Sequence, residues 1–403
     1  MTRLSRSHFS LCIAASFLSA CGGPQAAVTP AAVTAAARAT PVRPAFSYVT
    51  LHSFGSASDG EAPRAGLIEV NGTLYGTTVG GGVYHRGTVY SVTTSGTETV
   101  LHSFGSGTDG ALPYAGLIDV NGTLYGTTGG GGANSCVIDG YVQGCGTVFS
   151  ITTNGSETVL HSFDGNDGAD PEAGLINVNG TLYSTTYNGG AHDAGTVYSI
   201  TTTGSQTLLH SFGLSSDGAH PIAGLCDVNG TLYGTTLTGG TQGLGTVYSI
   251  TTTDTETVLH SFGSGSDGAS PRAGLVNAQG ILYGTTLDGG ADGFGTVYNI
   301  TTSGTETVWY SFHGKRRGAN PGAGVLAVNG KLFGTTISGG PYHSGIIYKI
   351  SRTGTEAVLH VFGLGRDGAE PVSDLLNVHG TLYGTTYRNG ANHFGGIVFA
   401  YTP

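Results

Sequence analysis

The chain has 403 residues, of which 72 are glycine and only 10% are charged, and its formal net charge is −10. Its three lysines, Lys315, Lys331 and Lys349, form no basic stripe that could neutralise a run of phosphates, so nucleic acid is excluded as an expected partner. Hydrophobic residues still make up 38% of the chain and recur at regular spacing, which excludes a wholly disordered protein.

Residues 1–20 have the features of an export signal. Arg3 and Arg6 precede a mostly apolar stretch, residues 9–18, that is too short to span a bilayer. The following Leu-Ser-Ala-Cys ends at Cys21 and resembles the lipobox of bacterial lipoproteins, whose cysteine becomes the acylated N-terminus. We therefore expect Cys21 to anchor the protein in a lipid bilayer. The alternative is an ordinary signal peptide, which would leave the protein soluble.

Residues 21–46 are expected to be a flexible tether. They consist mainly of Ala, Pro, Thr and Val without patterning, and such a segment cannot bury enough surface to offset its ordering entropy. Gly22 stands where an inner-membrane retention signal would place Asp. The expected location is therefore the cell envelope, at the outer membrane.

A repeat of about 50 residues fills the remainder, residues 47–403. The phrase Leu-His-Ser-Phe and its altered forms begin at positions 51, 101, 160, 209, 259, 309 and 359. Seven copies at this period, without a helical pattern, are typical of propeller blades. The sequence therefore predicts an all-β fold, a seven-bladed β-propeller of four-stranded antiparallel blades.

Each copy contains four strand-like runs rich in Val, Ile, Tyr and Thr. Asn-Gly, as in Asn71-Gly72, separates the first two runs and predicts a two-residue type I′ hairpin. A short turn also joins strands three and four, whereas a Gly-Gly loop and an S-D-G-A-x-P loop form the other two connections. Because direction reverses at every strand, both long loops emerge on one face, the long-loop face, and both short turns on the other, the tight-turn face.

The two ends of the repeat region are predicted to pair. The last copy stops after its third strand, at residues 396–402, and an unpartnered fourth strand precedes the first copy at residues 47–54. Joining these pieces completes blade seven and leaves no open seam in the ring.

The repeated unit AGLIDVNGTLYGTT, followed by GG and GTVYSITT, closely resembles the GloVer (Gloeo/Verruco-type) tandem repeat of exported bacterial proteins. The resemblance covers residues 47–403. More remotely, the unit resembles kelch and pyrroloquinoline-quinone-type propeller blades. The GloVer resemblance implies a surface-anchored propeller and supplies no catalytic motif.

Side chains that recur in every blade are interpreted as structural. The repeated histidines, such as His52, lie on outer strands spread around the ring and are too far apart to share an ion. The repeated aspartates, such as Asp59, are expected to accept backbone N–H groups and hold the inter-blade loop. Calcium in each loop is the alternative, but D-G-A-x-P lacks the alternating oxygen ligands of a calcium loop. We expect no metal and no cofactor.

One loop insertion carries two cysteines. Cys136 and Cys145 are separated by eight residues, and an exported protein meets oxidising conditions. A local disulfide is therefore expected.

Residues that break the pattern on the long-loop face are the candidates for ligand binding. The residues before and after the loop proline vary between blades and are expected to ring the mouth of the channel. Aromatic rings beside amides and carboxylates suit sugars and other polar, flat-faced ligands. The alternative is that these are merely tolerated loop residues. The candidates are Tyr84, His85, Arg86, Tyr114, Asp170, Glu172, His192, Asp193, His220, Phe294, Lys315, Arg316, Arg317, Tyr342, His343, Glu370, Asp374, Arg388, His393 and Phe394.

Three functions are compatible with these observations. The first is a monomeric, surface-anchored, non-catalytic module that binds a carbohydrate, another polar ligand or a protein. The second is a carbohydrate-active enzyme, a glycosidase or lyase, which would need two close carboxylates from Asp170, Glu172, Glu370 and Asp374. The third is an architectural envelope protein. The sequence shows no recognisable pairing of a nucleophile with a base, and this favours the non-catalytic binding module.

Overall fold

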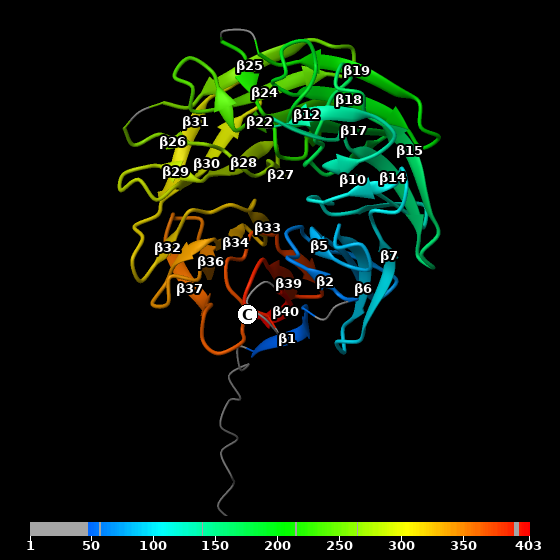
Figure 1. Cartoon of the computed structure of the whole chain (residues 1–403). Helices are drawn as coiled ribbons and strands as arrows, with labels where there is room; N and C mark the ends of the chain where they lie inside the picture. The colour runs from blue at the N-terminus through cyan, green and yellow to red at the C-terminus, as the bar shows by residue number, and fades with distance from the viewer. Residues whose placement is uncertain (1–46, 56–57, 139, 214–215, 264, 391–394) are drawn as a thin grey trace, which may run out of the picture. The chain divides into compact units, whose positions relative to one another are not determined.

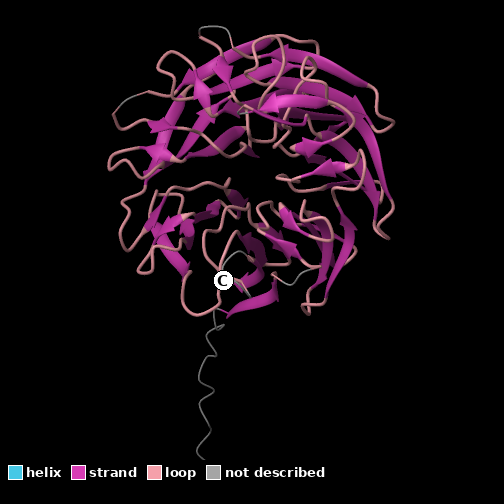
Figure 2. Ribbon diagram, in the orientation of Figure 1, coloured by secondary structure: helices cyan, strands magenta, loops and turns pink. Residues whose placement is uncertain are grey.

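The structure is a computed structural model that describes residues 47–55, 58–138, 140–213, 216–263, 265–390 and 395–403. Cys21 and the candidates His393 and Phe394 lie outside the described residues. The compact unit spans Phe46–Pro403, and its described part consists of strands and loops (Figure 2). Within that part, no helix is long and apolar enough to cross a membrane.

Seven four-stranded antiparallel sheets form the blades, arranged around a central axis (Figure 1). This confirms the predicted fold. From the axis outwards, blade 1 contains β3 (Ile68–Val70), β4 (Thr73–Thr78), β6 (Thr88–Thr93) and β7 (Glu98–Ser103); blade 2 contains β9 (Ile118–Val120), β10 (Thr123–Thr128), β14 (Thr147–Thr152) and β15 (Glu157–Ser162). In the same order, blade 3 contains β16 (Ile176–Val178), β17 (Thr181–Thr186), β18 (Thr196–Thr201) and β19 (Gln206–Ser211); blade 4 contains β21 (Cys226–Val228), β22 (Thr231–Thr236), β24 (Thr246–Thr251) and β25 (Glu256–Ser261); blade 5 contains β27 (Val276–Ala278), β28 (Ile281–Thr286), β30 (Thr296–Thr301) and β31 (Glu306–Ser311). Blade 6 contains β33 (Leu326–Val328), β34 (Lys331–Thr336), β36 (Ile346–Ile350) and β37 (Glu356–Val361), and blade 7 contains β38 (Leu376–Val378), β39 (Thr381–Thr386), β40 (Ile397–Thr402) and β1 (Ser47–Ser53).

The hairpins between the first two strands have the predicted geometry. Asn71 and Gly72 have φ of 53° and 81°, the left-handed region that a type I′ turn requires at both positions. In blade 2, the Gly122 N–H also donates to the Asp119 carboxylate at 3.0 Å. Short polar side chains therefore fix the hairpins of the tight-turn face.

Strand β1 closes the ring, as predicted. It pairs antiparallel with β40, and the register begins with Ser47 opposite Thr402. A Cβ on Gly396 would lie 2.7 Å from Cδ of Pro63, and the same glycine–proline contact joins Gly87 of blade 1 to Pro113 of blade 2. The junction between the last and first blades is thus built like the other junctions.

Each pair of neighbouring blades encloses a hydrophobic cluster. Between blades 7 and 1, the buried side chains include Phe54, Leu74, Tyr90 and Val398. Phe54 packs edge-to-face on Tyr90 with ring centroids 4.9 Å apart, a favourable aromatic geometry. The core is therefore distributed among the blade interfaces, as expected of a repeat ring.

The two long connections of each blade lie together. Short ladders pair the inter-blade loop with the Gly-Gly loop: β2 (Gly60–Glu61) with β5 (Gly80–Gly81), β8 (Gly110–Ala111) with β11 (Gly130–Gly131), β20 (Gly218–Ala219) with β23 (Thr238–Gly239), β26 (Gly268–Ala269) with β29 (Asp288–Gly289), and β32 (Gly318–Ala319) with β35 (Ser338–Gly339). These ladders hold the base of the long-loop face rigid.

The loop insertion of blade 2 forms an additional hairpin, β12 (Ser135–Ile138) and β13 (Tyr141–Gly144). A disulfide between Cys136 and Cys145 ties it down, with Cα atoms 5.1 Å apart.

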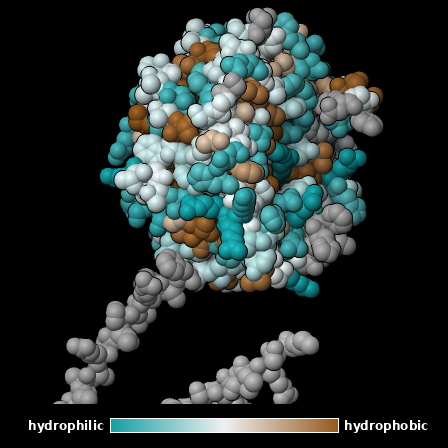
Figure 3. Space-filling model, turned by 90° about the vertical axis from the view of Figure 1, so that its left-hand side faces the viewer, coloured by the Kyte–Doolittle hydropathy of each residue, from teal (hydrophilic) through white to brown (hydrophobic). Residues whose placement is uncertain are grey.

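The side of the ring seen in Figure 3 carries hydrophobic side chains only in separate patches among polar ones. This side of the described structure therefore offers no continuous apolar surface of the kind that marks a large permanent interface.

Candidate functional site

A cavity of about 340 Å³ lies on the propeller axis. The residue that follows each loop proline contributes to its wall, so every blade supplies one such position. The seven residues are Arg64, Tyr114, Glu172, Ile222, Arg272, Gly322 and Val372. The structure thus brings together the candidates Tyr114 and Glu172 with residues that the sequence marked only as a varying position.

The backbone before each proline explains how this position can vary. The preceding residue is left-handed in all seven blades, with φ between 54° and 58°, although none of the seven is glycine. Such a conformation costs about 1–2 kcal/mol for an ordinary residue. Backbone bonds hold it: Leu112 donates to the Arg86 carbonyl at 2.8 Å and accepts from the Gly129 N–H at 3.0 Å. The chain path is therefore fixed by the backbone, whatever side chain follows the proline.

Beside these positions, glycines from five blades line the cavity, and Asp374 takes the equivalent place in blade 7. The glycines are crowded, since a Cβ on Gly274 would lie 2.9 Å from the Gly224 carbonyl oxygen. Asp374 lies across from Gly324, whose N–H donates to its Oδ1 at 2.6 Å. The Asp374 side chain is exposed within the cavity, and desolvation by the surrounding blades raises the pKa of its carboxyl.

Polar side chains gather on the wall formed by blades 1, 2 and 3. The Arg64 guanidinium lies over the Tyr114 ring, 5.1 Å from its centroid. Burial raises the pKa of Glu172, and Arg64 opposes this shift. Burial, together with the charges of Glu172 and Asp170, raises the pKa of Tyr114 to about 12. Tyr114 is therefore a neutral phenol at physiological pH.

The opposite wall is more apolar. Ile222 and Val372 line it, and a Cβ on Gly322 would lie 2.4 Å from Cδ1 of Ile337. Arg272 and Asp374 are the charged exceptions. The cavity therefore offers a polar, partly aromatic side and an apolar side to one occupant.

A second cavity, of about 290 Å³, lies on the long-loop face between blades 7, 1 and 2; we call it the outer cavity. Glu61, His85, Tyr387 and Arg388 are among its lining residues. The Arg388 guanidinium lies over the Tyr387 ring at 5.3 Å and reaches the Glu370 carboxylate at 3.5 Å. Tyr387 was not a candidate from sequence; the signal was the varying residue after each Thr-Thr pair.

The structure does not gather the remaining candidates into one site. The Gly-Gly loop residues are exposed and spread over several blades; they are Tyr84, Arg86, His192, Asp193, Phe294, Tyr342 and His343. His220 packs on Tyr187, with ring centroids 4.7 Å apart. Asp170 borders Gly129 beside Tyr114, outside the residues that line the axial cavity.

The basic run of blade 6 is divided between two environments. Lys315 and Arg316 are exposed. Arg317 pairs with Glu356 at 2.9 Å, and the Glu356 carboxylate also accepts a bond from the Tyr310 hydroxyl at 3.0 Å. Arg317 thus has a structural partner, which leaves the other two charges available to solvent.

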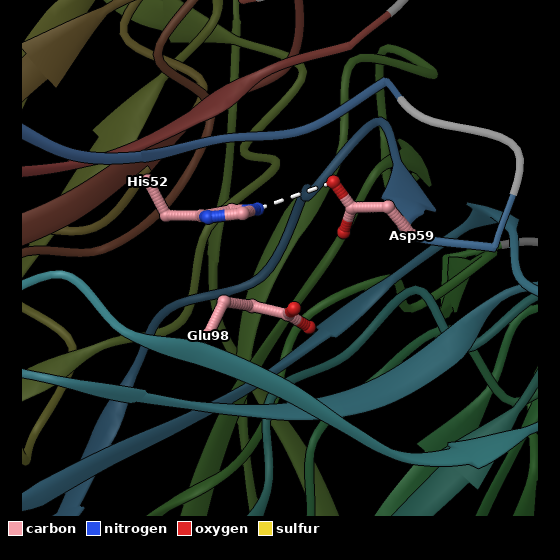
Figure 4. Close-up of side chains that lie close together, drawn as sticks. All are labelled: His52, Asp59 and Glu98. Atoms are coloured by element: carbon pink, nitrogen blue, oxygen red, sulfur yellow. Dashed lines mark hydrogen bonds and ion pairs between the residues drawn. The ribbon is translucent and has the colours of Figure 1, made fainter.

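Histidine and carboxylate side chains meet on the outer strands, away from the axis. His52 and Asp59 lie 3.2 Å apart, and Glu98 of the next blade faces them (Figure 4). Their possible ligand atoms lie within 4.8 Å of one another, and the described residues contain two equivalent groups, around Asp217 and Asp267. Each group links the outer strands of two neighbouring blades.

The junction between blades 5 and 6 indicates what this cluster needs. There, Tyr310 and Arg317 replace the histidine and the aspartate while the glutamate remains as Glu356. A fixed cation thus offsets the buried carboxylate where the histidine is lost. The same residue types could hold a divalent metal, but the bonds seen here already give them a structural role between blades. Asp59, for example, accepts the Gly60 N–H at 2.8 Å.

A family model described as the Gloeobacter/Verrucomicrobia repeat matches residues 38–138, 135–326 and 310–403. No curated protein matches the chain. Among solved structures, virginiamycin B lyase from Staphylococcus aureus is similar with a TM-score of 0.60 and 15% identity, covering 89% of this chain and 99% of the lyase. A streptogramin B lyase is similar with a TM-score of 0.60 and 16% identity, covering 89% and 98%. At this identity the likeness shows the fold alone.

Proposed function

The chain belongs to the Gloeobacter/Verrucomicrobia repeat family, and from that premise we propose that it is a non-catalytic module that binds a neutral carbohydrate at the axial cavity. One observation carries the proposal: strands of nearly constant sequence present six residue types at the seven positions after the loop proline. Because the backbone fixes the chain path at these positions, their side chains are free of structural constraint and can serve recognition.

The chemistry of the wall favours a sugar. The half-buried Tyr114 offers an apolar ring face with a hydroxyl at its edge, the combination that suits the faces and hydroxyls of a pyranose. Two arginines and two carboxyls line the cavity, namely Arg64, Arg272, Glu172 and Asp374. Because these formal charges balance, the cavity favours a neutral ligand over a polyanion.

The proposed module works at the cell envelope, with Cys21 as its lipid anchor and residues 21–46 as the tether. The lipobox-like motif supports this location. Replacing the acyl acceptor, Cys21→Ser, should move the protein from the membrane fraction to the soluble fraction after export. A mutant that still sediments with membranes would show that Cys21 is not the anchor.

An enzyme is the second candidate, because Glu172 and Asp374 line the same cavity and both have raised pKa values. A carboxyl whose pKa is raised is suited to act as a general acid in glycoside cleavage. Incubating reducing-end-labelled oligosaccharides with the wild type and with Glu172→Gln distinguishes the two functions. Cleavage by the wild type that the variant loses would establish the enzyme; binding without cleavage supports the module.

Screening the purified protein on an array of immobilised glycans and polysaccharides tests the proposed function. We expect retention of one class of neutral glycan by the wild type and its loss in Tyr114→Ala. The paired variant Tyr342→Ala with His343→Ala, exposed on the same face but outside the cavity, should retain it. No retention of any neutral glycan would overturn the proposal.

A further inference from the structure

A tyrosine lines each of the two cavities. Tyr114 lines the axial cavity and Tyr387 lines the outer one. Tyr387 lies close enough to Tyr114 to contribute to the rise of its pKa. The residue two positions before Tyr114, Leu112, lines the outer cavity as well. The same loop of blade 2 therefore forms part of both walls.

The two cavities share one construction. In each, an arginine guanidinium lies over a tyrosine ring, Arg64 over Tyr114 at 5.1 Å and Arg388 over Tyr387 at 5.3 Å. Such a cation–π contact contributes about 0.5–1 kcal/mol at an exposed site, which favours this orientation of the ring. Both rings are half-buried, so each keeps accessible surface. The structure thus places an aromatic ring beside an arginine in each of the two cavities.

The sizes of the cavities favour a chain of units over a single ligand. Ligand sites commonly measure about 300–1,000 Å³, so the axial cavity, at about 340 Å³, lies at the small end of that range, and the outer cavity, at about 290 Å³, just below it. Each has room for about one small unit. Charges are mixed in the outer cavity too, since Glu61 and Arg388 both line it.

From this arrangement we propose that the outer cavity is a second subsite, and that the occupant is a linear neutral oligosaccharide whose terminal unit enters the axial cavity and whose next units cross Tyr387. This inference rests on the proposed function. It adds the length of the ligand and its direction across the face. Arg388 and Glu61 then supply the hydrogen-bonding groups for the outer units, and Tyr387 supplies the apolar contact.

The test is isothermal titration with two ladders, glucose to cellotetraose and N-acetylglucosamine to its tetramer. For the ladder that binds, affinity should rise at least tenfold from monomer to trimer. Tyr387→Ala and Arg388→Ala should weaken trimer binding about tenfold and leave the monomer unchanged within twofold. The matched control is Arg366→Ala, an exposed arginine of the same face outside both cavities.

The outcomes separate the two proposals. Equal affinity for monomer and trimer, or trimer binding that ignores both outer variants, would overturn the second subsite while the module itself stands. If no member of either ladder binds, both proposals are overturned. If Arg366→Ala weakens the trimer as much as Arg388→Ala does, the effect belongs to general charge on the face and the subsite is also overturned.

Discussion

The hydroxyl of Thr385, in the last blade, donates a hydrogen bond to the carbonyl oxygen of Ala65, in the first blade, over 3.1 Å. The same bond links every neighbouring pair; between blades 3 and 4, for example, Thr185 donates to Ala223 over 3.3 Å. These threonines are fully buried. The junction between the last and first blades therefore has the same side-chain to backbone hydrogen bond as the other junctions.

Removing that link should destabilise the closing junction and an interior junction alike. Thr385→Val and Thr185→Val each leave a buried carbonyl without its donor, which costs about 1–3 kcal/mol of unfolding free energy. Chemical denaturation of the two variants and the wild type measures this. A loss in Thr185→Val without a comparable loss in Thr385→Val would show that the junction between blades 7 and 1 contributes less to stability than an interior junction.

Stability should fall as the pH rises from about 5 to 8. Burial and the neighbouring Asp217 raise the pKa of Glu256 to about 7, so the folded state holds a proton that the unfolded state releases near its ordinary value. Between these two pKa values, each increase in pH costs folding free energy. The pKa of His210 is also raised, and a histidine with a raised pKa loses its stabilisation as the pH rises through that value. Both groups act in the same direction.

Glu256→Gln should flatten this pH profile. The amide resembles the protonated carboxyl, and Gln206 already occupies the equivalent position in blade 3, where its Nε2 lies 3.5 Å from the Asp167 carbonyl. The expected result is a melting temperature at pH 8 closer to its value at pH 5 than in the wild type. Glu69→Gln, at an exposed hairpin carboxylate, is the control. An unchanged slope in Glu256→Gln would contradict the assignment.

Tyr248→Phe should leave stability unchanged or raise it. The Tyr248 hydroxyl is buried without a hydrogen-bond partner and lies against Gly234, where a Cβ would come within 2.4 Å of it. An unsatisfied buried hydroxyl costs about 1–3 kcal/mol. Blade 2 already has Phe149 at this position. A clear decrease in the melting temperature would indicate a partner for the hydroxyl, such as a buried water.

Much of the fold could be predicted because the same pattern of strands and turns recurs seven times in the sequence. The 50-residue period predicted the blades, and Asn71-Gly72 predicted the type of hairpin. The unpartnered strand before the first copy predicted how the ring is closed. These features depend on local sequence, where turn chemistry and strand patterning act directly. The family match and the sheet order confirm them.

The site could be predicted only in part. The varying residues after each loop proline do line the axial cavity. Tyr387, which lines the outer cavity, was not among the candidates because it follows a strand whose pattern looked structural. The contact of His52 with Asp59 and Glu98 was missed as well, since it joins neighbouring blades. The exchange to Tyr310 and Arg317 beside the retained Glu356 was the available signal. Contacts between repeats depend on how blades dock, which one copy of the repeat does not encode.

The measurement that tests the binding site most directly compares the two faces of the ring. Glucose and N-acetylglucosamine oligomers are titrated into the wild type, into Tyr114→Ala with Glu172→Gln, and into Thr252→Ala with Thr253→Ala, an exposed pair on the tight-turn face. The Thr pair should bind as the wild type does, because exposed changes of this kind usually cost within about 0.5 kcal/mol. The cavity pair should lose binding while its melting temperature changes little. Binding that survives in the cavity pair and fails in the Thr pair would contradict the assignment of the site to the axial cavity.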